Sequence, residues 1–104
     1  MIRVLIADDH ALMREGMKRI LAATGDILTI GEASSGEEAM ERYAGSLDGI
    51  QLLLTDVVMP GINGRVLAET LTSRRPSLKV LFMSGYTEDS VLGAQRRDVQ
   101  FLQK

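Results

Sequence analysis

The sequence contains no cysteine among its 104 residues. Disulfide bonds, thiolate zinc sites and thiol nucleophiles are therefore excluded together. The absence is compatible with a reducing cytoplasm, which is where we expect the protein to act. The chain also lacks an excess of either charge, since its net charge is −2. It therefore has no electrostatic basis for binding nucleic acid or an anionic membrane.

Long apolar runs are missing as well. The longest are four to six residues, far below the roughly 20 that span a bilayer. Residues 1–7 are apolar but pass directly into Asp8 and Asp9, without the basic and long apolar segments of a targeting peptide. With 45% hydrophobic and 25% charged residues and no linker, we expect one globular domain over residues 1–104.

Short aliphatic runs recur along the chain, and runs of this kind are typical of strands buried on both faces of a sheet. They cover residues 2–7, 27–30, 50–54, 79–83 and 99–102. Between them lie segments with helical spacing. Such alternation predicts right-handed βαβ units and a doubly wound α/β domain with a parallel sheet. Periodicity alone leaves the strand order open between two common arrangements.

Helix-boundary residues delimit the helical segments. The first helix should begin near Asp9 or His10 and end at Gly25, which suits a left-handed position. The second should begin with a capping box formed by Ser35 and Glu38. A third is predicted over 63–74 and a shorter fourth over 87–97. The expected core-facing residues of the first and third helices are Leu12, Met13, Met17, Ile20, Leu21, Val66, Leu67 and Leu71.

Polar residues stand where the predicted strands end. Asp8 and Asp9 follow the first strand, Asp56 the third, Ser84 the fourth, and Lys104 the fifth. The carboxyl ends of parallel strands meet at one edge of the sheet, where ligands bind in such folds. Singly, each of these residues is more often a helix cap, a turn residue or a surface lysine. Five suitable groups at four strand ends predict a shared site instead.

The chemistry of this residue set indicates phosphoryl transfer. Three neighbouring carboxylates repel each other unless a cation neutralises them, and Mg²⁺ prefers such oxygen ligands. The metal ion, the Ser84 hydroxyl and the Lys104 ammonium would then receive the three equatorial phosphoryl oxygens. Asp56 would be the nucleophile.

The sequence resembles the receiver domain of two-component response regulators. Four segments carry the resemblance: VLIADD (4–9), LLTDVVMPGING (53–64), VLFMSGY (80–86) and FLQK (101–104). It implies a flavodoxin-like five-stranded sheet in the order 2-1-3-4-5. It also implies Mg²⁺-dependent phosphotransfer from a histidine kinase, or from a phosphotransfer domain, which switches a protein-interaction surface.

By position, the resemblance implies that Asp56 is the phosphoacceptor and that Asp8 and Asp9 bind Mg²⁺, Asp9 more directly. Asp56 and the backbone carbonyl of Val58 would be further metal ligands. Ser84 and Lys104 would contact the phosphoryl group. Ser84 would also form the conformational switch with the aromatic ring of Phe101. The histidine after the acid pair, His10, has two interpretations: a residue that tunes the metal site, and a solvent-facing residue in the first helical turn. The second is favoured.

Members of this family continue beyond the lysine with a fifth helix, whereas this sequence ends at Lys104. Without that helix, apolar sheet surface of about 500 Å² would be uncovered. We therefore expect self-association such as a homodimer, a partner helix, or a remainder of the chain that covers it.

Two other functions compete with the phosphoaccepting receiver. One is a phosphorylation-independent interaction module, for which the complete site is an unfavourable sign. The other is an aspartyl-phosphate phosphatase acting on an outside substrate, which typically needs an aspartate where Val58 stands. We therefore expect no enzyme activity beyond the chain's own phosphorylation and dephosphorylation.

Overall fold

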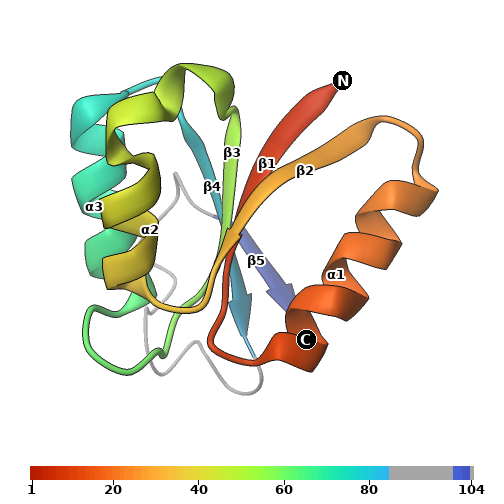
Figure 1. Ribbon diagram of the computed structural model, residues 1–104, viewed down its shortest axis with the longest axis horizontal. Coiled ribbons are helices and arrows are strands. Elements are labelled where there is room, and N and C mark those ends of the chain that lie inside the picture. The colour runs from red at the N-terminus through yellow and green to blue at the C-terminus, as the bar shows by residue number, and fades with distance from the viewer. Residues whose placement is uncertain (85–99, 104) are drawn as a thin grey trace.

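The computed structural model describes residues 1–84 and 100–103, and side chains over residues 1–83. The elements are β1 (Ile2–Ala7), α1 (Ala11–Ala23), β2 (Ile27–Ala33), α2 (Gly36–Tyr43), the 3₁₀ helix η1 (Ala44–Gly49), β3 (Leu52–Asp56), α3 (Gly64–Arg74), β4 (Lys79–Ser84) and β5 (Gln100–Gln103). The strands form a parallel sheet in the order β2-β1-β3-β4-β5 (Figure 1). The flavodoxin-like arrangement is thus confirmed for the order 2-1-3-4, with the backbone of β5 beside β4.

The sheet separates two apolar layers. Helix α1 lies on one face, and α2 and α3 lie on the other (Figure 1). Side chains alternate along β1, so Val4 and Ile6 pack with Met17 of α1. Leu5 and Ala7 belong to the opposite layer, which α2 and α3 cover. A central strand covered on both faces is apolar throughout, as its sequence predicted.

Capping fixes where the helices on the second face begin. The Ser35 hydroxyl accepts a hydrogen bond from the Glu38 N–H at 3.0 Å, which confirms the predicted start of α2. The reciprocal half of the capping box is wrong, because the Glu38 carboxylate accepts from Ser34 instead. Asn63 caps α3 through its side-chain oxygen and the Val66 N–H.

Three predicted core positions are wrong. Leu12 and Ile20 of α1 are 88% and 62% exposed, and Val66 of α3 is 43% exposed. In α1 the residues that pack in the layer against the sheet are Met17 and Leu21. At about 100° per residue, Leu12 lies about 140° from Met17 around the helix axis and Ile20 about 60°. The sheet covers only one side of α1, so apolar residues on the other sides of the helix remain exposed.

The second strand was also predicted to be buried on both faces, and this is wrong. Strand β2 is at the edge and pairs only with β1 in the described part of the chain. Its Leu28 and Ile30 are 46% and 38% exposed. The fourth helix, predicted over 87–97, lies outside the described residues. No helix among residues 1–84 has the length and hydropathy needed to cross a membrane.

Candidate metal centre

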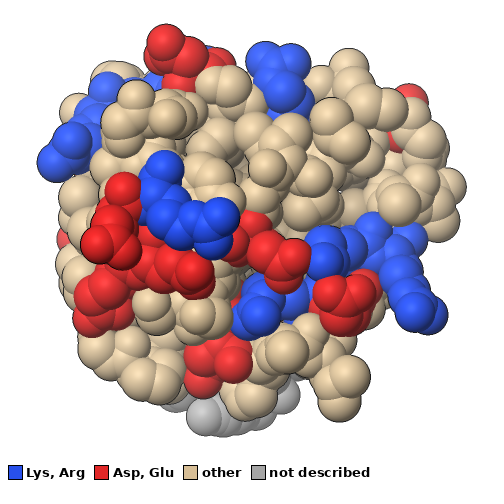
Figure 2. Space-filling model, in the orientation of Figure 1, with Lys and Arg blue, Asp and Glu red and all other residues tan. Residues whose placement is uncertain are grey.

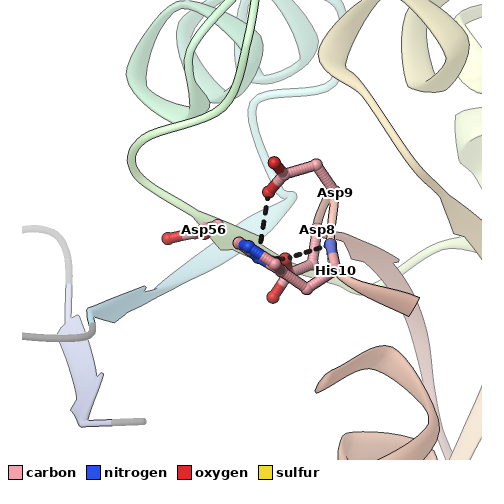
Figure 3. Close-up of side chains that lie close together, drawn as sticks. All are labelled: Asp8, Asp9, His10 and Asp56. Carbon is pink, nitrogen blue, oxygen red and sulfur yellow. Dashed lines mark hydrogen bonds and ion pairs between the residues drawn. The ribbon is translucent and has the colours of Figure 1, made fainter. Parts of the chain in front are cut away.

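The sheet register brings the acidic residues together. Ala7 of β1 pairs with Thr55 of β3, so the next residues, Asp8 and Asp56, leave adjacent strands at the same edge. One ligand atom from each of Asp8, Asp9, His10 and Asp56 lies within 4.8 Å of the others (Figure 3). The structure therefore brings the three predicted carboxylates together.

Burial raises the free-energy cost of keeping these neighbouring carboxylates charged. Asp8 is completely buried and Asp56 is 6% exposed, whereas the Asp9 side chain is 27% exposed. Asp9 Oδ1 is a buried oxygen that accepts no hydrogen bond from the described residues, although His10 Nδ1 lies 3.2 Å from it. An acceptor left in this position costs free energy unless a cation or water reaches it. The three carboxylates converge at the carboxyl ends of neighbouring strands. Such a set of oxygen donors fits a hard divalent ion such as Mg²⁺.

Several contacts hold the turn between β1 and α1. The Asp8 N–H donates to the Ala33 carbonyl at 3.0 Å, which ties the end of β1 to β2. Asp8 Oδ1 accepts from the His10 N–H at 2.9 Å. The Asp8 carbonyl accepts from Arg14 Nη1 at 2.5 Å. Arg14 therefore positions the acid pair from the first turn of α1.

Arg14 is itself held by an ion-pair network between α1 and β2. Its Nε donates to Glu32 at 2.8 Å, and Lys18 contacts the other Glu32 oxygen at 2.6 Å and Glu15 at 2.8 Å. The hydrogen bond from Lys18 lowers the pKa of Glu32 most, and the hydrogen bond from Arg14 lowers it further.

Acidic side chains gather over α2, whereas acidic and basic side chains are interleaved over α1 (Figure 2).

The loop after β3 packs tightly against the phosphoacceptor candidate. The Gly64 N–H donates to the Val57 carbonyl at 2.9 Å, and a Cβ added at Gly64 would collide with the Asp56 carbonyl. On the other side of the loop, the Glu37 carboxylate accepts from the Ile62 N–H at 3.1 Å. Val58, predicted to offer its carbonyl to the metal ion, is 62% exposed at the start of this loop.

Three predicted site residues belong to β4, β5 and the chain end. Met83 pairs with Asp56, so the backbone of Ser84 follows directly at the same edge of the sheet. The backbone of Phe101 pairs with Phe82. The side chains of Ser84 and Phe101, and Lys104 as a whole, lie outside the described residues.

Sequence reasoning missed one contributor to the site. Arg14 was not singled out, although its place four residues after His10 sets it in the first turn of α1, near the acid pair. The interpretation of His10 as a solvent-facing residue is confirmed, because its side chain is 67% exposed. Its Nδ1 nevertheless lies 3.3 Å from Asp8 Oδ1 and 3.2 Å from Asp9 Oδ1.

Comparison with known proteins agrees with this arrangement. The family model described as the response regulator receiver domain matches residues 4–104. The DNA-binding transcriptional activator DevR/DosR of Mycobacterium tuberculosis is 36% identical over 92 residues, which cover 88% of this chain and 42% of that protein. The chain thus spans about two fifths of that relative's length.

Solved structures show the same fold. The signal receiver domain of the M. tuberculosis response regulator NarL superposes with a TM-score of 0.82 and 34% identity, covering 98% of this chain and 82% of that one. RcsB of Salmonella enterica serovar Typhimurium, bound to promoter rprA in the presence of the phosphomimetic BeF₃⁻, gives 0.84 and 25%, covering 100% and 87%. The matching strand order, the convergent carboxylates and the family match together show that this chain belongs to the response regulator receiver domains.

Proposed function

We propose that this domain accepts a phosphoryl group on Asp56 in a Mg²⁺-dependent reaction with a phosphohistidine of a histidine kinase or phosphotransfer domain. The observation that carries the proposal is the placement of Asp56. Asp56 is buried at the end of β3. One of its carboxylate oxygens lies within 4.8 Å of carboxylate oxygens of Asp8 and Asp9. The chain that carries this arrangement matches the receiver domain family.

In the proposed reaction an Asp56 carboxylate oxygen attacks the phosphorus atom. A P–O bond to Asp56 forms while the P–N bond to the donor histidine breaks, and the imidazole departs with the electron pair. Mg²⁺, when bound, neutralises charge on the phosphoryl oxygens and the carboxylates. Asp8, Asp9, Asp56 and the Val58 carbonyl would hold it.

The chain's own residues contribute preorganisation. Arg14 and the Ala33 carbonyl fix the backbone of Asp8 at both its carbonyl and its N–H. A turn held in this way presents its carboxylates without having to reorganise during the transfer. Burial of Asp56 keeps water from competing with it for the phosphoryl group.

The remaining roles in the proposal rest on the family. Ser84 and Lys104 would bind the two other phosphoryl oxygens, and movement of Ser84 would let the Phe101 ring turn inward. The altered surface would then be read by a partner protein in the cytoplasm. On this proposal the chain acts on no outside substrate. Self-association through the sheet face beside α1 stays a prediction that light scattering tests.

Beryllofluoride, which mimics a phosphoryl group, tests the proposal directly. With Mg²⁺ present, we expect it to raise the melting temperature of the wild type and to shift the amide resonances of residues around Asp56. Asp56→Asn keeps the size of the side chain but removes the charged ligand, so it should show neither response. The proposal would be contradicted if beryllofluoride at saturating Mg²⁺ changed neither the melting temperature nor the amide resonances of the wild type. It would also be contradicted if Asp56→Asn still showed these changes.

A further inference from the structure

The loop between β3 and α3 covers residues 57–63 and is held differently along its length. At its start the side chains of Val57 and Met59 are buried. Further along, Pro60 and Gly61 are exposed, so burial does not fix the loop there. The N-terminus of α2 lies beside this exposed part of the loop (Figure 1).

Glu37, in the first turn of α2, reaches the exposed part of the loop. Its Oε2 accepts a hydrogen bond from the Ile62 N–H at 3.1 Å. The same carboxylate lies against Gly61, where an added Cβ would collide with it. Gly61 has a φ of 75°, a conformation that glycine adopts readily. The missing side chain and the left-handed backbone at Gly61 allow the carboxylate to approach the loop this closely.

Gly36, the first residue of α2, brings the helix backbone equally close to the loop. A Cβ added there would lie 2.8 Å from the Ile62 carbonyl oxygen and 3.0 Å from Ile62 Cβ. Ile62 also packs against the core layer that α2 and α3 cover. The N-terminus of α2 and the loop are therefore in close contact, and Glu37 adds a directed hydrogen bond to that contact.

Val58 lies in the same loop, and the proposed function assigns its backbone carbonyl to Mg²⁺. The direction of a carbonyl is set by the planar peptide unit to which it belongs, and so by the path of the loop. Mg²⁺ demands nearly ideal octahedral geometry, so a displaced carbonyl weakens its binding. We propose that Glu37 is a positioning residue for the metal centre, which holds the loop in the conformation that presents the Val58 carbonyl to Mg²⁺. The inference rests on the proposed function, because it uses the same ligand set.

A hydrogen bond in this exposed position should influence metal binding more than folding. The bond from Ile62 to Glu37 lies at the surface, so water can replace the carboxylate as the acceptor when the side chain is truncated. The domain should therefore remain folded while the loop loses its preferred conformation. Groups that orient metal ligands without touching the ion typically change metal affinity by about 10–100-fold.

Titration of Mg²⁺ into metal-free protein, followed by the amide resonances around Asp56, tests the proposal. The proteins compared are the wild type, Glu37→Ala, Glu37→Gln and Glu41→Ala. Glu37→Gln removes the charge but keeps an oxygen that can accept from the Ile62 N–H. Glu41→Ala is the matched control, because it removes the same charge from another exposed position of α2.

We expect Glu37→Ala to weaken Mg²⁺ binding about tenfold and to speed hydrogen exchange of the Ile62 amide. Glu37→Gln should restore most of the affinity. Glu41→Ala should stay within about twofold of the wild type, since salt screens an exposed charge. The melting temperatures of all four metal-free proteins should agree within about 4 °C.

The proposal would be overturned if Glu37→Ala bound Mg²⁺ as tightly as the wild type, or if exchange of the Ile62 amide were unchanged. It would also be overturned if Glu37→Gln or Glu41→Ala lost as much affinity as Glu37→Ala. Such a result would assign the effect to charge and not to the hydrogen bond.

The beryllofluoride response separates this inference from the proposed function. If the wild type binds Mg²⁺ but shows no response to beryllofluoride, the phosphoacceptor role is refuted, and the Mg²⁺ affinities of the variants still decide the role of Glu37. If the wild type responds and Glu37→Ala binds Mg²⁺ normally, the role of Glu37 alone is refuted. A wild type that binds no Mg²⁺ refutes both.

Discussion

Gly64 is the residue whose replacement should most directly disturb Asp56, the proposed phosphoacceptor. It is the first residue of α3, and its N–H donates to the Val57 carbonyl at 2.9 Å. An added Cβ would collide with the Asp56 carbonyl oxygen. It would also lie 2.9 Å from the Asp56 carbonyl carbon and 3.1 Å from Val57 Cα. These neighbours are backbone atoms, so Gly64→Ala must move either the end of β3 or the start of α3.

The expected cost follows from this collision. Overpacking a well-packed position costs about 1–3 kcal/mol, and alanine recovers at most about 1 kcal/mol through helix propensity. For a domain of this size, 1 kcal/mol corresponds to about 4–8 °C in melting temperature. We therefore expect Gly64→Ala to melt several degrees below the wild type and to bind beryllofluoride more weakly, because the backbone of Asp56 is displaced.

Gly16 offers a matched control. It lies inside α1, its φ is not positive, and a Cβ there meets nothing within 4 Å. Gly16→Ala should therefore stabilise the domain by about 0.5–1 kcal/mol. Urea unfolding followed by circular dichroism measures both variants. Equal shifts of the same sign, or an unchanged beryllofluoride affinity in Gly64→Ala, would refute the close approach to Asp56.

Three further outcomes are expected. Ser35→Ala removes the cap of α2 and should lower the free energy of unfolding by about 1 kcal/mol, measured by urea denaturation; a loss below about 0.5 kcal/mol would contradict the role of the cap. Leu71→Ala truncates a completely buried side chain and should cost about 2–5 kcal/mol, whereas the same truncation of the exposed Leu12 should cost far less. Glu32→Gln tests the network of α1 and β2. The Glu32 pKa is lowered in the folded state, so its stabilisation is present above the ordinary value of 4.5 and is lost as pH falls through the folded value. The stability difference between wild type and Glu32→Gln should therefore shrink between pH 7 and pH 3, and a constant difference would show that the ionised carboxylate contributes nothing.

Much of the site could be predicted because its signals are local. The apolar run of β1 and the acid pair that follows it are neighbours in sequence, and parallel strands bring their carboxyl ends to one edge. That geometry suffices to place Asp8 and Asp56 together, as the pairing of Ala7 with Thr55 shows. The caps of α2 and α3 are likewise local chemistry, and Ser35 and Asn63 cap as their residue types predict.

Other features depended on contacts between distant segments. Leu12, Ile20 and Leu28 are apolar but exposed, because burial is decided by which elements flank a position and not by its own hydropathy. The edge position of β2 follows from the strand order, which periodicity cannot give. The sequence by itself determined that three carboxylates meet at the carboxyl ends of the strands. Only the tertiary structure decided that Arg14 holds their turn, that His10 faces them and that Gly64 must leave room for the Asp56 carbonyl, since each depends on packing between separate elements.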